Sequence, residues 1–165
     1  MEIVEGKNTV EYMFFIYALP ALSSCCGDDV DCSKLESLAR EGKALSREEM
    51  QKLVPKAFER MLQTVGEDYW TLEGVRKYWW VEHNKIIDNR GEGYEHTIHE
   101  QRESCKVKFW KVENLEEKLI NLAGNKESGQ AANTMDYLLK PGDYVTTHLG
   151  KIIEIITEKE FSEYG

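Results

Sequence analysis

The chain has 165 residues with a formal net charge of −9, and 31% of its residues are charged and 41% hydrophobic. An acidic surface repels the phosphates of nucleic acids and of anionic membranes, so binding to DNA, RNA or a membrane surface is disfavoured. This length suits one ordinary domain or two small ones that share an interface.

The first feature along the chain is the apolar stretch 12–22. It is about half of the roughly 20 residues that a membrane span needs, and Pro20 interrupts it. Acidic Glu2 and Glu5 precede it, whereas a secretory signal begins with positive charge. We expect a buried core helix here. Four cysteines without a secretory leader favour reduced thiols and a cytoplasmic setting over a disulfide framework.

Helix starts are indicated at three places before residue 50, where a cap-type residue is followed three positions later by Glu: 8–11, 33–36 and 46–49. Pro55 lies inside the third apolar pattern and predicts a kink or a new first turn. A further long helix is expected from Thr71 up to the turn residues 89–91. Residues 1–101 are therefore predicted to form a helical region.

The aromatic residues of this region are concentrated at Tyr69-Trp70 and Tyr78-Trp79-Trp80. Their spacing favours a helix-packing core, with a ligand platform as the alternative. The segment 25–32 holds Cys25, Cys26 and Cys32 beside three Asp residues, but it lacks the paired Cys-x-x-Cys spacing of structural zinc sites. We interpret it as a loop with Asp caps for the next helix.

The tail of the chain has the pattern of short strands. Residues 105–109 alternate between apolar residues and lysine, which predicts a half-buried strand that begins at Cys105, and 115–122 predicts a second strand. The polar, Gly-flanked run 124–129 is expected to be a mobile loop.

The last two strands are predicted at 144–149 and 151–157, after a type II turn at Pro141-Gly142 and on either side of Gly150. Several short strands with intervening turns suit a small antiparallel barrel. The predicted class is α+β: an N-terminal helical region followed by a small antiparallel OB-like β-barrel at residues 102–165.

Residues 141–160 contain a Gly-Asp pair, an apolar strand, a His followed shortly by Gly, and an aliphatic strand running into an acidic segment. This order resembles the end of the HypC/HupF family of NiFe-hydrogenase maturation chaperones. The start of the tail is similar too, because Cys105 opens a stretch ending in Lys111-Val112 and its separation from His148 is comparable. The resemblance covers about a third of the chain, residues 104–160.

The resemblance implies an OB-like barrel whose cysteine and histidine help to hold an iron with diatomic ligands. Matched by position, Cys105 is the thiolate ligand and His148 the second iron-site residue. The implied partner is a protein, such as a maturation factor or a hydrogenase subunit. In that family the cysteine directly follows the initiator Met, whereas Cys105 is internal. A fainter resemblance, through Cys26-Gly27, 96–99 and the tail, is to uncharacterised longer proteins with a helical region before such a barrel.

The residue types themselves also favour a metal site. A thiol and an imidazole form a donor set that iron prefers, with zinc as the alternative. His96 and His99 lie just before Cys105 and would add one or two metal donors to Cys105 and His148. This requires that the segment 96–99 is helical, which places both imidazoles on one side, and that all four residues converge. The competing interpretations are a buried structural cysteine and two solvated histidines.

Three classes of function therefore remain open. We favour a non-enzymatic accessory protein for metallocofactor assembly that holds or delivers an iron centre. The second is a thiol-dependent enzyme in which Cys105 is the nucleophile and His148 or His99 the base. The third is a protein-interaction module without a metal. His148 would share its strand face with Tyr144 and Thr146, which could orient the imidazole.

Overall fold

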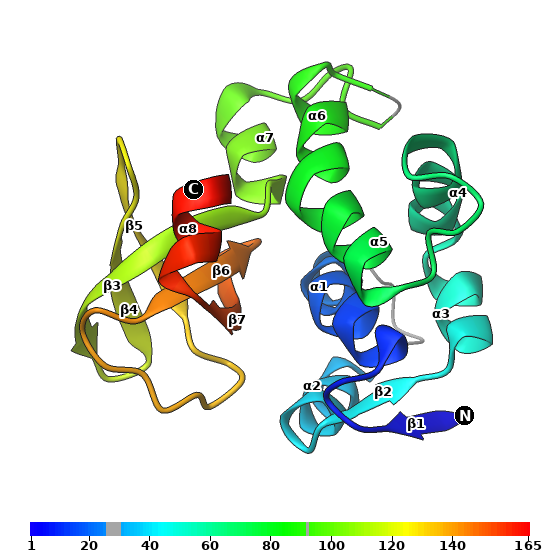
Figure 1. Cartoon of the computed structure of the whole chain (residues 1–165), viewed down its shortest axis with the longest axis horizontal. Helices are drawn as coiled ribbons and strands as arrows, with labels where there is room; N and C mark the ends of the chain where they lie inside the picture. Colours follow the sequence, from blue (N-terminus) through cyan, green and yellow to red (C-terminus); the bar gives the residue numbers. More distant parts are fainter. Residues whose placement is uncertain (26–30, 92) are drawn as a thin grey trace. The chain divides into compact units, whose positions relative to one another are not determined.

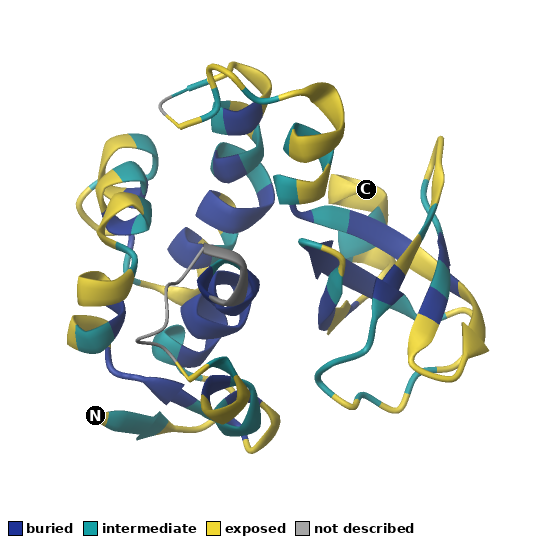
Figure 2. Ribbon diagram, turned by 180° about the vertical axis from the view of Figure 1, so that it is seen from behind, coloured by how far each residue is buried: buried dark blue, intermediate teal, exposed yellow. Residues whose placement is uncertain are grey.

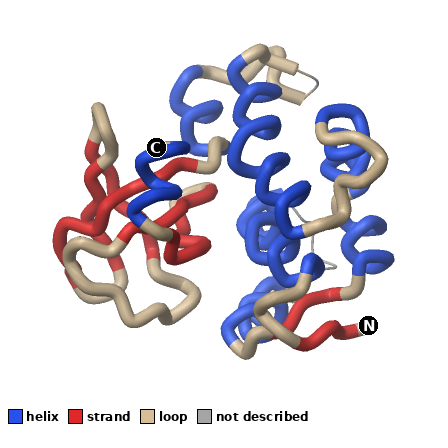
Figure 3. Tube along the Cα trace, viewed as in Figure 1, coloured by secondary structure: helices blue, strands red, loops and turns tan. Residues whose placement is uncertain are grey.

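The computed structural model spans the chain and describes residues 1–25, 31–91 and 93–165. The chain divides into two compact units, Met1–Ile86 and Ile87–Gly165. Helices dominate the first unit and a closed five-stranded barrel the second, which confirms the predicted α+β class (Figure 3). Helices also occur beside the barrel strands in the second unit, so they are spread through the chain.

The first unit contains two short strands and a series of helices (Figure 1). In chain order these are β1 (Ile3–Glu5), α1 (Val10–Cys25), α2 (Cys32–Arg40), β2 (Lys43–Leu45), α3 (Arg47–Leu53), α4 (Pro55–Thr64), α5 (Leu72–Lys77), the π-helix η1 (Tyr78–Glu82) and α6 (His83–Asp88), whose last two residues belong to the second unit. Strands β1 and β2 pair antiparallel. Pro55 is the first residue of α4, so the predicted new first turn is confirmed.

Helix α1 forms the core of the first unit, as its apolar sequence predicts (Figure 2). The Phe14 ring lies 4.8 Å from that of Phe58 and 5.7 Å from that of Trp79, measured between centroids. The Trp80 indole N–H donates to the Tyr17 hydroxyl at 2.8 Å. These contacts confirm that the clustered aromatic residues pack a helical core. In the described part of the chain, no helix combines the length and the apolar character that a membrane crossing requires.

The predicted cap of α3 is confirmed, whereas α1 is capped one residue after its predicted cap and α2 two residues before the serine of its capping-box pattern. Thr9, not Asn8, caps α1, and Asp31, not Ser33, caps α2; each side-chain oxygen accepts the backbone N–H three residues on, at 3.1 and 3.2 Å. In both cases a neighbouring polar side chain competes with the predicted cap, and the one at the actual turn satisfies the open N–H. Ser46 caps α3 as predicted.

The second unit carries the barrel, with a helix before its strands and another after them. In chain order its elements are α7 (His99–Cys105), β3 (Lys108–Glu116), β4 (Leu119–Ala123), β5 (Ser128–Ala132), β6 (Tyr144–His148), β7 (Lys151–Ile156) and α8 (Glu158–Tyr164). The strand order around the barrel is β3-β4-β5-β7-β6, and β6 pairs with β3 to close it.

Closure of the barrel uses one parallel pairing, between β5 and β7, with Ala132 opposite Lys151. The other neighbouring strands are antiparallel. If the barrel strands β3 to β7 are renumbered 1 to 5 along the chain, their order around the barrel is 1-2-3-5-4. This is the arrangement of a five-stranded Greek-key OB barrel. The predicted OB-like barrel is thereby confirmed.

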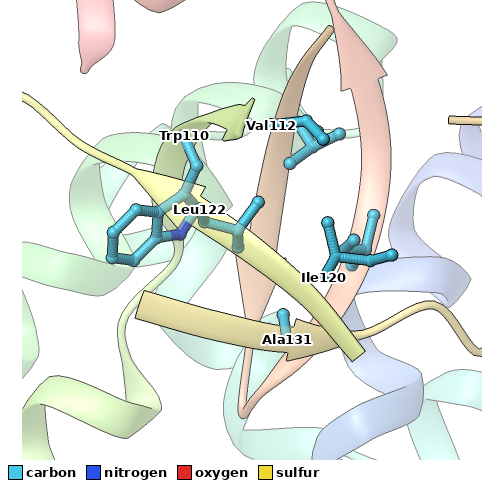
Figure 4. Packing of buried hydrophobic residues seen from close by; sticks show 7 residues of the cluster. Trp110, Val112, Ile120, Leu122 and Ala131 are labelled. Atoms are coloured by element: carbon cyan, nitrogen blue, oxygen red, sulfur yellow. The ribbon is translucent and has the colours of Figure 1, made fainter. Parts of the chain in front are cut away.

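A small set of apolar side chains fills the barrel interior (Figure 4). The buried members are Trp110, Val112, Ile120, Leu122, Ala131, Val145 and Ile152. The Trp110 indole N–H donates to the Thr147 hydroxyl at 2.8 Å, which satisfies its one polar group inside the barrel. Val145 and Thr147 therefore face inward, and the alternate residues of β6 face outward.

Two predicted turns are present at the ends of β6. Gly142 has a φ of 96° and the Asp143 N–H donates to the Lys140 carbonyl at 3.1 Å, as in the predicted type II turn. Leu149 and Gly150, with φ of 51° and 76°, form the two-residue connection between β6 and β7. The break predicted at Gly150 is therefore a tight hairpin turn.

One strand prediction and one loop prediction in the tail need correction. Cys105 ends α7 instead of opening a strand, because the segment before it is capped: the Ile98 N–H donates to the Gln101 side chain at 3.1 Å. Three alternating residues are too short a pattern to outweigh helix formation there. The predicted loop 124–129 is also shorter than expected, since β5 begins at Ser128 and pairs with β4.

Candidate cysteine and histidine site

Cys105 is the last residue of α7 and is partly buried. Cys105 and Cys32 are both in thiol form. Lys106 follows with extended backbone and leads into β3. The thiol therefore belongs to the connection between a short helix and the first strand of the barrel.

His148 is the last residue of β6, and only 2% of its surface is exposed. It lies on the outer face of the barrel, because Val145 and Thr147 take the inward positions of this strand. Thr146, which is fully buried, shares the outer face with it, as predicted. Buried polar side chains of this kind normally have hydrogen-bond partners.

One backbone hydrogen bond links the surroundings of these two residues. The N–H of Leu149, directly after His148, donates to the carbonyl of Ser104, directly before Cys105, at 3.1 Å. The end of α7 is thus joined to the end of β6 within the second unit. The fold brings together the two chain segments that the sequence marks as a donor pair.

A network of ion pairs holds α7 against the barrel. The Glu103 carboxylate forms ion pairs with Lys106 at 3.0 Å and with Lys108 at 2.9 Å. Lys106 also forms an ion pair with Asp88, and Lys108 forms one with Glu127 at 3.2 Å. The hydrogen bond from Lys108 is the largest cause that lowers the pKa of Glu103 to about 2, partial burial opposes it, and Lys106 adds to the lowering. These charges fix the residues on both sides of Cys105.

The two remaining histidines lie at the other end of α7. His99 is the first residue of the helix, so its Cα is about 9 Å from that of Cys105 along the axis. His96 precedes the helix in a turn, and both side chains are exposed. The condition that residues 96–99 are helical is therefore not met, because only His99 belongs to α7. Within residues 1–25, 31–91 and 93–165, the structure gathers no three His, Cys, Asp or Glu side chains suited to one metal ion.

The other cysteines belong to the first unit. Cys32 is the first residue of α2, next to the cap Asp31, which confirms the interpretation of an Asp-capped helix start. Cys25 ends α1, and Cys26 lies outside the described residues.

Sequence reasoning missed Glu154, which is 9% exposed and lies in β7 opposite Thr146. Its backbone N–H donates to the Thr146 hydroxyl at 3.2 Å. The signal was available: Glu154 is a charge inside the run Ile152-Ile153-Glu154-Ile155-Ile156. Simple alternation could not assign its face, because the pairing register shifts between Thr146 and Thr147.

The donor types at this site are compatible with iron. A thiolate is a soft ligand and an imidazole a borderline one, and iron accepts both. A metal held by only these two donors would need further ligands from elsewhere. Comparison of the chain with protein-family models, with curated proteins and with solved structures finds no match.

Proposed function

We propose that this protein is an accessory protein for metallocofactor assembly, which holds or delivers an iron centre through Cys105 and His148. The observation that carries the proposal is the hydrogen bond between Leu149 and Ser104, which joins the two segments at 3.1 Å. The closed OB-type barrel supports it as well, since the resemblance at 104–160 implies that architecture.

In this proposal iron is the cargo, and the two residues act differently. Cys105 is partly exposed at the end of a helix, where its thiol can meet an incoming centre. His148 is buried on a strand, where the barrel holds its ring in place. A partner protein, such as a maturation factor or a hydrogenase subunit, would supply or receive the cargo. Reduced thiols are consistent with a cytoplasmic location.

The test is production of the full chain under anaerobic conditions together with hydrogenase maturation proteins. We expect the purified protein to carry iron with infrared bands from bound CO or cyanide. Cys105→Ser removes the thiolate and should abolish the bands. Cys32→Ser, which changes the thiol of α2, is the matched control and should retain them. Wild-type protein without iron and without such bands would contradict the proposal.

The same pair of residues also suits the second candidate, a thiol-dependent enzyme with Cys105 as nucleophile. The position of Cys105 speaks against it, because reactive thiolates are favoured at helix N-termini and Cys105 lies at a helix C-terminus. Peptide-level mass spectrometry after iodoacetamide treatment at neutral pH distinguishes the two. Rapid alkylation of Cys105 relative to Cys32 would favour the enzyme.

A further inference from the structure

The carboxylate of Glu154 has no role in the function proposed above. Acidic side chains are rarely buried without a compensating partner, because the charge loses its hydration. Glu154 lies in the middle of β7 with 9% of its surface exposed, so its carboxylate calls for such a partner. We therefore ask which residue near His148 could act as that partner.

A β-bulge explains how Glu154 comes to face this site. Thr147 pairs with Ile152 and Thr146 with Glu154, so Ile153 is an extra residue without a partner in the ladder. In a regular ladder Ile153 would lie opposite Thr146. The bulge places Glu154 there instead, which re-aims a charged side chain onto the outer face.

The outer face of β6 is the face of His148. Thr146 and His148 are two positions apart on one strand, so their side chains project to the same side. Glu154, opposite Thr146, is thus a diagonal neighbour of His148 across the β6–β7 pair. Such neighbours have Cα atoms about 7–8 Å apart, within reach of a long carboxylate and an imidazole.

We propose that Glu154 is a positioning residue for His148: its carboxylate accepts a hydrogen bond from the imidazole and fixes which ring nitrogen is left to bind iron. A ligating histidine needs its second nitrogen oriented by such a partner. The role of the bound iron rests on the proposed function, whereas the carboxylate–imidazole pair can be tested in metal-free protein.

The experiment measures the imidazole nitrogen shifts of His148 by NMR in the ¹⁵N-labelled, metal-free full chain, above the pH at which the ring is protonated. We expect a single tautomer in the wild type and a mixture of both in Glu154→Gln. Glu158→Gln makes the same chemical change at an exposed position four residues on and should leave the tautomer unchanged. Titration with Co²⁺ should show affinity reduced about 10–100-fold in Glu154→Gln.

Two results would overturn the inference: both tautomers in the wild type, or an unchanged single tautomer in a folded Glu154→Gln. If the variant does not fold, a mixture of tautomers in the wild type would still contradict the inference. The tautomer does not depend on iron, so its outcome is separate from that of the infrared experiment. A single tautomer controlled by Glu154 with no iron bands would retain the inference and reject the proposed function.

Discussion

At the scale of single residues, Trp110 determines how the barrel interior is filled. Its ring lies against β5, so the facing residue of that strand has to be small. A Cβ atom added at Gly129 would lie 2.9 Å from Cη2 of Trp110, closer than packed carbon atoms approach. The glycine of this strand is therefore required by the indole across the barrel and not by backbone conformation.

We expect Gly129→Ala to lower the free energy of unfolding by about 1–3 kcal/mol, because the buried ring has to shift to admit the methyl group. Gly124→Ala is the matched control. Its Cβ would meet the same ring at 3.4 Å, an ordinary contact distance. We expect the control to be unchanged or more stable by about 0.5 kcal/mol. Urea unfolding monitored by tryptophan fluorescence measures both, and equal losses would contradict the packing argument.

At the scale of elements, α7 is attached to the barrel by charge as well as by the Leu149–Ser104 hydrogen bond. Glu103 lies at the centre of this attachment, between Lys106 and Lys108. Since Cys105 lies between Glu103 and Lys106 in the chain, the ion pairs fix the backbone that presents the thiol. Loss of the network should therefore affect both barrel stability and the proposed site.

Protonation of Glu103 should weaken this attachment in acid. The folded-state pKa of about 2 is below the ordinary value of 4.5, so the contribution is present above pH 4.5 and is lost as the pH falls toward about 2. The difference corresponds to about 3 kcal/mol at most, and solvent screening of this 31% exposed side chain reduces it to about 1–2 kcal/mol.

The variant Glu103→Gln should be less stable than the wild type by about 1–2 kcal/mol at pH 7 and equally stable near pH 2. Unfolding by urea at a series of pH values measures this difference. Glu100→Gln changes an exposed carboxylate of the same helix and should show no such trend. A Glu103→Gln difference that persists undiminished at pH 2 would exclude the ion pairs as its cause.

Element prediction from the sequence succeeded where the local pattern and the tertiary structure agree. The turn at Pro141-Gly142 and the core helix 12–22 are examples, because backbone preference and apolar content each point to one structure. It failed where a short pattern was ambiguous. Cys105 alternates like a strand residue, yet capping before His99 makes the segment helical. The position of Glu154 depends on a bulge, which alternation cannot reveal.

At the scale of the whole molecule, the two units have separate cores, and the predicted boundary after residue 101 differs from the division after Ile86. A direct test compares the fragments 87–165 and 102–165. The longer one keeps all of α7 and the pair between Asp88 and Lys106. We expect it to be more stable by about 1 kcal/mol or more, since the shorter fragment loses the first residues of α7, 99–101, and the ion pair.

Thermal and urea unfolding of the two fragments measure this difference. Asp88→Asn in the longer fragment separates the ion pair from the helix, and it should account for only part of the loss. Equal stability of both fragments would support a barrel domain that begins at residue 102. Absence of a cooperative transition in both would mean that the barrel cannot fold without the first unit.

The parallel pairing between β5 and β7, called the parallel seam here, determines where the barrel should open first. Ala132 is paired with Lys151 there, and its N–H donates to the Gly150 carbonyl at 2.9 Å, whereas the other seams are longer antiparallel ladders. Local opening should therefore begin at this seam and leave two unpaired strand edges. Such edges are templates for strand exchange between molecules. Aggregation of this acidic protein should accordingly begin with the opened barrel, and amide exchange should be fastest along β5 and the start of β7.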